Sequence, residues 1–257
     1  MRAPEVSTVM VDGRALEVAR IAGDASRAPV VLLHEGLGSV TMWKDWPGEL
    51  AAATGRTTIA YSRYGHGASD VLGAPRAVSY MHREGEIVLP ALLDALSVQR
   101  AVLFGHSDGA SIALVAAAAA PSRVAGLVLE APHVFVEDLS VASIAAAGAA
   151  YADGRLRNAL ARYHRDADAT FHGWNGVWLD PAFRAWNIEA YVERVAAPLL
   201  VIQGEDDEYG TLAQVDAIAR RAPQTERLVL PACGHSPHRD RAPEVLAASA
   251  AFIAKLP

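Results

Sequence analysis

Cysteine is almost absent from this chain, whose only thiol among 257 residues is Cys233. A single thiol excludes an intrachain disulfide and indicates a reducing compartment. Basic residues are also few: 23 lysines and arginines stand against 29 acidic residues, and a net charge of −6 gives no basic surface for nucleic acid or an anionic membrane. We therefore expect no nucleic-acid partner.

Long apolar runs are missing as well. No stretch approaches the roughly 18 residues of a membrane span, and the longest alanine-rich run ends at Pro121. The first residues lack the apolar stretch of a secretory signal. These absences predict a soluble, cytoplasmic protein that does not enter a membrane. We expect a monomer or a homodimer, although no feature of the sequence decides between them.

Hydrophobic residues make up 52% of the chain and charged residues 20%, which is enough apolar surface for a large core and too little charge for disorder. Continuous apolar runs such as Val30–Leu33 and Leu199–Ile202 are typical of strands buried on both faces of a mostly parallel sheet. An antiparallel hairpin is expected through Asp12 and Gly13. Because strands and helices alternate, we predict an α/β fold with three layers and an eight-stranded, mostly parallel sheet.

The predicted strands are Val6–Val11, Leu16–Ile21, Val30–His34, Thr57–Ser62, Ala101–Phe104, Gly126–Glu130, Leu199–Gln203 and Arg227–Leu230. The predicted helices are Trp43–Ala53, Tyr80–Leu96, Ala110–Ala120, Leu212–Ala222 and Pro243–Ala254.

One long interval, residues 134–187, shows helical patterns and no strand. An insertion between two sheet strands cannot join the core layers, so we expect it to lie over the strand ends as a helical cap. The sequence thus predicts a core of residues 1–133 and 188–257 with a cap of residues 134–187. An ordinary long helical crossover is the alternative.

The strongest motif is Gly105-His106-Ser107-Asp108-Gly109, placed between an apolar strand and an alanine-rich helix. Such a tight strand-to-helix turn pushes the serine hydroxyl out of the backbone line, and glycines on either side let strand and helix come close. In that setting Ser107 is predicted to be a catalytic nucleophile, whereas His106 is expected to pack.

A serine hydroxyl needs a base, and the base needs an orienting carboxylate. Both should follow strands, because functional groups gather at the carboxyl ends of a parallel sheet. The favoured base is His235, with His238 as the alternative. The favoured acid is Asp207, with Asp206 second and Glu130 third. His235, His238 and Asp240 could together ligate a metal, but no further ligand cluster supports such a site, so none is expected.

Two amides are expected to meet the charge that develops on a carbonyl oxygen during attack. One belongs to Asp108, which follows the nucleophile, and the other to the glycine-rich loop after the third strand. Gly36 is the predicted second donor and Leu37 the alternative.

These motifs resemble the α/β-hydrolase superfamily over essentially the whole chain. The resemblance rests on Leu32–Ser39, Ser62–Asp70, Gly105–Gly109, Gln203–Asp207 and Gly234-His235. It implies a helical cap after the sixth strand, and it favours Asp207 over Asp206 because the family's acid follows a glycine by three residues. This chain departs from the family at Glu35, where relatives usually carry glycine after the histidine, so a carboxylate is placed near the site.

The resemblance and the serine together imply a carboxylesterase that cleaves small to medium soluble esters through an acyl-enzyme, with no cofactor and no metal. The substrate pocket is expected to include Glu35, Leu37, His133, Trp174 and Trp178. Two other reactions stay open. Asp108 resembles the aspartate of the valacyclovirase branch, which attracts amino-acid esters, and hydrolases of carbon–carbon bonds in ring-fission products use the same triad. A catalytically silent ligand receptor is the non-enzymatic alternative.

Overall fold

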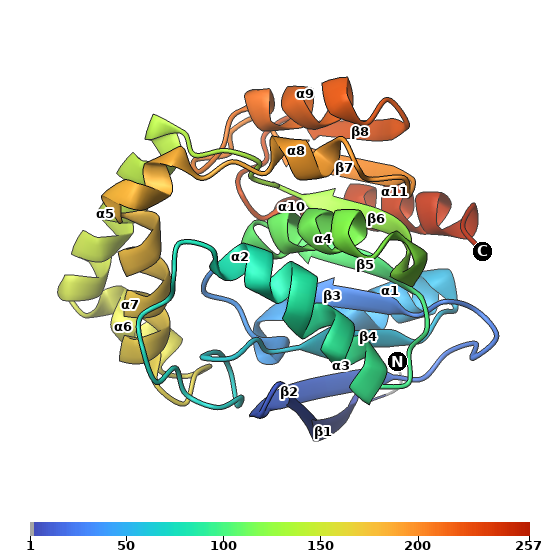
Figure 1. Ribbon diagram of the computed structural model, residues 1–257, viewed down its shortest axis with the longest axis horizontal. Helices are drawn as coiled ribbons and strands as arrows, with labels where there is room; N and C mark the ends of the chain where they lie inside the picture. The colour runs from blue at the N-terminus through green and yellow to red at the C-terminus, as the bar shows by residue number, and fades with distance from the viewer. Residues whose placement is uncertain (1–2) are drawn as a thin grey trace.

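A computed structural model describes residues 3–257 of the protein, shown in Figure 1. One eight-stranded sheet runs through it in the order β1-β2-β4-β3-β5-β6-β7-β8. The strands are β1 (Glu5–Val11), β2 (Arg14–Ile21), β3 (Val30–Leu33), β4 (Thr58–Tyr61), β5 (Ala101–His106), β6 (Val124–Glu130), β7 (Leu199–Gly204) and β8 (Thr225–Leu230). All eight predicted strands are present, each with ends within two residues of the prediction.

The sheet is parallel from β4 to β8, whereas β2 runs antiparallel to both of its neighbours, β1 and β4. The expected hairpin joins β1 and β2, with Val11 opposite Arg14. Its two turn residues, Asp12 and Gly13, have φ angles of 50° and 72°. Positive φ at both central positions is the backbone of a two-residue turn that matches the twist of the strands.

The helices are α1 (Trp46–Thr54), α2 (Tyr80–Arg83), α3 (Leu89–Ala95), α4 (Asp108–Ala119), α5 (Asp138–Ala152), α6 (Arg155–Leu160), α7 (Ala167–Trp178), α8 (Glu189–Val192), α9 (Leu212–Arg221), α10 (Pro237–Asp240) and α11 (Ala242–Ala254). Short 3-10 turns lie at η1 (Val40–Trp43), η3 (Pro121–Arg123) and η4 (Pro181–Ala185), and a π-helical turn at η2 (Glu84–Val88).

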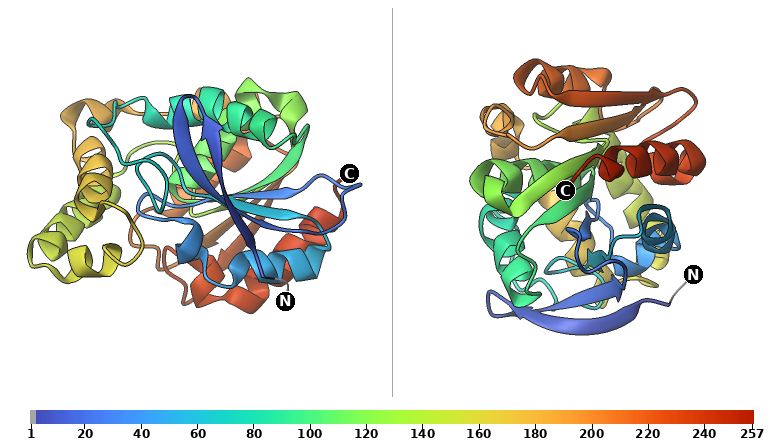
Figure 2. Two further views of the ribbon diagram at one scale, coloured as in Figure 1. Left: turned by 90° about the horizontal axis from the view of Figure 1, so that it is seen from below. Right: turned by 90° about the vertical axis from the view of Figure 1, so that its right-hand side faces the viewer.

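Helices cover both faces of the sheet, which gives the three predicted layers (Figure 2). One face packs against α1 and α11 through a cluster that includes Trp46, Phe104 and Phe252. The other packs against α4 and its neighbours, and the small side chains of α4 are buried from Ala110 to Ala118. Small residues let this helix lie close to the sheet.

Two expected helices are interrupted, which corrects the sequence prediction. The first, Trp43–Ala53, is divided at Lys44, whose φ of 55° ends η1 before α1 begins with Pro47 in its first turn. The second, Tyr80–Leu96, contains the π-helical turn η2. Pro90 has no N–H to donate to the preceding turn, which explains why regular α-helical bonding fails there.

Residues 134–187 lie between β6 and β7 and form α5, α6, α7 and η4 without joining the sheet. In Figure 1 the three helices stand together on the left, beyond one end of the strands. Their aromatic core contains Phe171, Trp178, Phe183 and Trp186. Within residues 3–257, no helix has both the length and the apolar character needed to cross a bilayer.

Candidate active site

The turn between β5 and α4 holds Ser107 in a backbone conformation that few non-glycine residues adopt. Its φ is 54° and its ψ is −119°. The flanking glycines permit it: a Cβ at Gly109 would lie 2.0 Å from the carbonyl oxygen of Leu33, and one at Gly105 would lie 2.6 Å from Cα of Ala110. Any side chain at these two positions would therefore separate the strand from the helix.

Three side chains from three separate loops meet at this turn. The hydroxyl of Ser107 donates to Nε2 of His235 over 2.9 Å. Nδ1 of His235 donates in turn to Asp207, at 2.8 Å from Oδ1 and 3.0 Å from Oδ2. His235 therefore has one ring nitrogen free to accept the serine proton and the other held by a carboxylate. The structure brings Asp207 to this position, whereas Asp206 is exposed and Glu130 pairs elsewhere.

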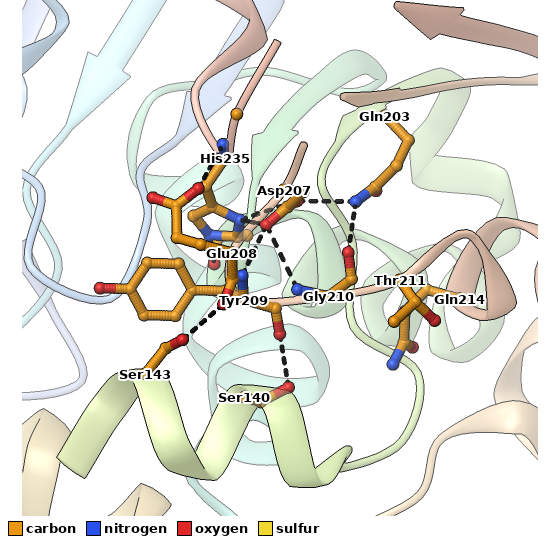
Figure 3. A network of polar contacts seen from close by, with 12 residues as sticks. Ser140, Ser143, Gln203, Asp207, Glu208, Tyr209, Gly210, Thr211, Gln214 and His235 are labelled. Carbon is orange, nitrogen blue, oxygen red and sulfur yellow. Dashed lines mark hydrogen bonds and ion pairs between the residues drawn. The ribbon is translucent and has the colours of Figure 1, made fainter. Parts of the chain in front are cut away.

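Asp207 is buried in the loop after β7, and further donors surround its carboxylate (Figure 3). The Gln203 amide donates to Oδ2 over 2.6 Å, and the backbone amides of Tyr209 and Gly210 donate to Oδ1 over 2.8 Å and 3.2 Å. Burial favours the neutral acid, but the hydrogen bonds from His235 and Tyr209 outweigh it, so the pKa of Asp207 lies below its usual value. The carboxylate is thus ionised and fixed in direction.

Helix α5 also reaches the loop that carries Asp207. Ser140 donates its hydroxyl to the carbonyl of Tyr209, and Ser143 donates to that of Glu208 (Figure 3). The Tyr209 ring lies against His235 with centroids 4.7 Å apart. One helix of the 134–187 segment is therefore attached directly to the acid loop.

The glycine-rich loop after β3 is shaped by a buried arginine. Arg63 donates an N–H of Nη1 to the carbonyl of His34 and an N–H of Nη2, over 2.9 Å, to the carbonyl of Glu35. Its own amide donates to Nε2 of His34 over 3.0 Å. The carbonyls of His34 and Glu35 are thus both hydrogen-bonded to Arg63. The amide of the next residue, Gly36, has no acceptor among residues 3–257. The amide of Asp108 also lacks an intrahelical partner, because it opens α4.

A cavity of about 210 Å³ lies over Ser107. Its lining is mainly apolar and comes from the loop after β3, from the elbow and from α5, α6 and α7; it includes Ile144, Leu156, Leu160, Met42 and Tyr209. A larger groove of about 370 Å³ between β2 and α1 shares no lining residue with this cavity and contains no nucleophile paired with a base. The pairing of Ser107 with His235 therefore favours the smaller cavity as the candidate active site.

All five side chains predicted for the pocket line this cavity: Glu35, Leu37, His133, Trp174 and Trp178. Burial and the neighbouring His235 lower the pKa of His133 to about 3, so its imidazole is neutral. Trp174 packs against the glycine-rich loop after β3, since a Cβ at Gly36 would lie 2.1 Å from its indole nitrogen.

Asp108 is buried, and its carboxylate has two donors. Tyr80 donates its hydroxyl over 2.5 Å, and Trp178 of α7 donates its indole N–H over 3.2 Å. Burial raises the pKa of Asp108 above its usual value despite the nearby Arg63. The carboxylate is thus already engaged by the protein.

The three residues considered as metal ligands in the sequence, His235, His238 and Asp240, each have a different partner in the structure. His235 pairs with Asp207, His238 donates Nδ1 to Glu130 over 2.7 Å, and Asp240 accepts from the amide of Gly234 over 2.9 Å. A different buried set, His106, Glu130 and His238, places ligand-type atoms within 4.8 Å of one another. Hydrogen bonds already use one nitrogen of each of these two histidines.

Several residues around the site were not predicted. Arg63, Tyr80, Gln203 and Tyr209 contribute through contacts with segments distant in the sequence or through a local turn. The spacing of residues along the sequence does not predict these four positions. The one available signal was the presence of charged and polar residues, such as Arg63 and Gln203, inside or directly after buried strands.

The chain is similar to known hydrolases in sequence and in fold. Residues 30–249 match the model of the alpha/beta hydrolase family. A putative carbamate hydrolase RutD of Variovorax paradoxus is 30% identical over 69% of this chain and 73% of its own length. The dihydrolipoyllysine-residue acetyltransferase component of the acetoin cleaving system of Pseudomonas putida is 29% identical over 98% of this chain and 70% of its own.

Among solved structures, a thermophilic esterase from Thermogutta terrifontis superimposes with a TM-score of 0.74 at 21% identity, covering 98% of both chains. At that identity the likeness concerns the fold. The family match, by contrast, spans most of the sequence, including the elbow and the loops that carry His235 and Asp207. The chain belongs to the alpha/beta hydrolase family.

Proposed function

We propose that this protein is a serine hydrolase that cleaves carboxylic esters of small to medium size through an acyl-enzyme. One observation carries the proposal: an unbroken hydrogen-bond chain runs from Ser107 through His235 to the ionised Asp207 at the floor of a cavity. Nucleophile, base and orienting acid stand in the geometry that serine catalysis requires.

The steps follow from that geometry. Ser107 attacks the ester carbonyl while His235 takes its proton, and Asp207 stabilises the imidazolium that forms. The amides of Asp108 and Gly36 receive the negative charge on the carbonyl oxygen. The imidazolium then protonates the leaving alcohol. In the second half of the reaction His235 activates a water molecule, which releases the acid and restores the Ser107 hydroxyl.

The cavity supports a small, largely apolar acyl group. About 210 Å³ of space leaves little room beyond a short chain or a single ring, and leucine, isoleucine and tryptophan side chains form much of its wall. We propose that residues 134–187 act as a cap, because α5, α6 and α7 supply that wall and α5 holds the acid loop. The substrate side of the site is then set by the cap and the catalytic side by the core.

The decisive experiment is Ser107→Ala, assayed on p-nitrophenyl butyrate with Ser122→Ala, an exposed serine, as the matched control. We expect Ser107→Ala to lose about 10³-fold or more in kcat while it keeps the wild-type circular dichroism spectrum and Tm. Ser122→Ala should behave as wild type. Full activity in folded Ser107→Ala would refute the mechanism.

An ester panel separates the alternative reactions. It should contain p-nitrophenyl esters of increasing acyl length, a ring-fission dienoate and an aryl carbamate, the last because a relative is described as a putative carbamate hydrolase. We expect the short neutral esters to have the highest kcat/KM. A higher value for the dienoate or the carbamate would replace the esterase proposal with that activity, and binding of esters without turnover by the wild type would favour the receptor.

Amino-acid esters test the role of the Asp108 carboxylate. Because Tyr80 and Trp178 already donate to it, we expect little attraction left for a substrate ammonium. Matched neutral and α-amino esters should therefore lose activity by the same factor in Asp108→Asn. A selective loss for the cationic ester would support the valacyclovirase-like alternative instead.

A further inference from the structure

We propose that Glu35, which is partly exposed, and the buried His106 form a carboxylate–imidazolium pair that fixes the backbone of the His235 loop and so positions His235 over Ser107. The pair deepens the proposed function and rests on it. His106 is here a positioning residue, because it contacts the backbone of the base loop and takes no proton from the substrate.

The geometry of His106 is specific. This residue directly precedes Ser107, and its Nε2 donates to the backbone carbonyl of His235 over 2.6 Å. Because a carbonyl can only accept, Nε2 must carry a proton. The two rings lie with centroids 5.3 Å apart. One short hydrogen bond thus joins the residue before the nucleophile to the residue that acts as base.

Glu35 faces the other nitrogen of the same ring. Its Oε2 lies 3.8 Å from Nδ1 of His106, which is buried and has no hydrogen-bond partner among residues 3–257. Gly38 makes room for the carboxylate, since a Cβ there would lie 2.1 Å from Oε2 of Glu35. Glutamate at this position therefore comes with a glycine that allows it to reach His106.

The charges around His106 favour its protonated form. Burial alone would lower the pKa of His106, but Glu35 first, then Glu130 and the His235 carbonyl, raise it above its usual value. The same pairing lowers the pKa of Glu35, although the partial burial of its carboxylate opposes this shift. Two further titratable groups face His106: the rings of His235 and His238 both pack against its imidazole.

The consequence is a link between three loops that catalysis must hold in register. Glu35 lies in the loop that offers the Gly36 amide, His106 lies on the elbow, and His235 lies on the base loop. Arg63 fixes the same oxyanion loop from the other side through the Glu35 carbonyl. A displacement of about 1 Å between reacting groups can cost about 10²-fold in rate, so the pair acts on kcat.

Four variants test the proposal: Glu35→Gln, His106→Gln, His106→Leu and Glu205→Gln, the last an exposed carboxylate and the matched control. His106→Gln keeps an N–H that can reach the His235 carbonyl, whereas His106→Leu keeps none. We expect kcat to fall about tenfold in Glu35→Gln and His106→Gln and about a hundredfold in His106→Leu, with KM little changed. Glu205→Gln should match wild type.

A double-mutant cycle asks whether Glu35 acts through His106. If it does, Glu35→Gln adds no further loss of kcat on the His106→Leu background. Independent losses that multiply would overturn the pair. Equal kcat in His106→Gln and His106→Leu would show that the donor to His235 is irrelevant and would also overturn it.

A measurement on the wild-type protein avoids any dependence on how the His106 variants fold. In ¹⁵N-histidine NMR at about pH 6 we expect both ring nitrogens of His106 to carry protons, and Nδ1 to lose its proton in Glu35→Gln. A neutral His106 in the wild type would overturn the proposal. Wild-type kcat in Glu35→Gln, beside an inactive Ser107→Ala, would refute the pair alone, whereas an active Ser107→Ala would refute the proposed function.

Discussion

Trp178, the last residue of α7, donates its indole N–H to the carboxylate of Asp108, the residue after Ser107, over 3.2 Å. This hydrogen bond connects α7, which lies between β6 and β7 in the sequence, to the turn that carries Ser107. Tyr80 holds the same carboxylate from the core side. The Asp108 carboxylate is therefore bonded both to the wall of the cavity, through Trp178, and to the core, through Tyr80.

Removing this indole N–H should loosen the wall of the cavity. Trp178→Phe keeps an aromatic ring but loses the donor, so we expect kcat/KM on p-nitrophenyl butyrate to fall about tenfold, which corresponds to about 1.4 kcal/mol. Trp186→Phe is the matched control, because the Trp186 indole is buried in the same aromatic cluster and its N–H has no partner among the described residues. Equal losses in the two variants would assign the effect to ring size.

The acid of the proposed triad has an adjacent control in the chain. Asp207→Asn keeps the shape of the side chain but no longer favours the His235 tautomer that donates from Nδ1, so we expect kcat to fall about 10³- to 10⁴-fold. Asp206→Asn changes the exposed neighbouring residue and serves as the control. Burst kinetics on the same ester measure both variants. A smaller loss in Asp207→Asn than in Asp206→Asn would reassign the acid.

Gly36 should tolerate no side chain while Trp174 is in place. The Cβ of Gly36→Ala would lie 2.1 Å from the indole nitrogen of Trp174, so the oxyanion loop or the indole must move, and we expect kcat to fall about 10²-fold or more. Trp174→Ala removes the obstructing ring. The alanine at residue 36 should then cost much less on that background than in the wild type.

The control for this pair is Gly176→Ala, which also lies on the 134–187 segment and has no heavy atom within 4 Å of its added Cβ. It should leave kcat unchanged and stabilise α7 slightly, because alanine has a higher helix propensity than glycine. An equal penalty for Gly36→Ala with and without Trp174 would mean that residue 36 needs glycine for its backbone and not for space.

The strands and the positions of the three triad candidates could be predicted from sequence because each depends on local information. Continuous apolar runs such as Leu199–Ile202 mark buried strands, and functional side chains follow strand ends. The contacts that assemble the site are of another kind. Arg63 reaches the His34 carbonyl across 29 residues, and Trp178 reaches Asp108 across 70. No local pattern records such pairs.

The contacts of His106 could not be predicted from the sequence either. The residue before the nucleophile was expected to pack, and its ring is indeed buried. Its hydrogen bond to the His235 carbonyl spans 129 residues and exists only after β5 and the base loop come together. The departure from the family at Glu35 was visible in the sequence, but its partner was not.

Buried neutral histidines should make the protein sensitive to acid. His66 is buried beside His34 and His164, and Arg76 donates to its Nε2 over 2.9 Å. Burial first, and then these neighbours with Arg63, hold the pKa of His66 well below its usual value. A protonated ring would face the Arg76 guanidinium and lose its acceptor role.

The sign of the effect follows from linkage. The folded pKa of His66 is depressed, so below about pH 6.5 the unfolded chain binds a proton that the folded chain refuses, and the free energy of unfolding decreases as the pH falls. One such histidine contributes a loss of about 2 kcal/mol between pH 7.5 and pH 5. His66→Gln keeps an acceptor for Arg76 and cannot titrate, so urea unfolding should show a pH dependence about 2 kcal/mol smaller than in wild type. The control is His172→Gln, at an exposed position on α7, which should leave the pH dependence unchanged. If the free energy of unfolding changed equally with pH in wild type, His66→Gln and His172→Gln, His66 would not be held neutral.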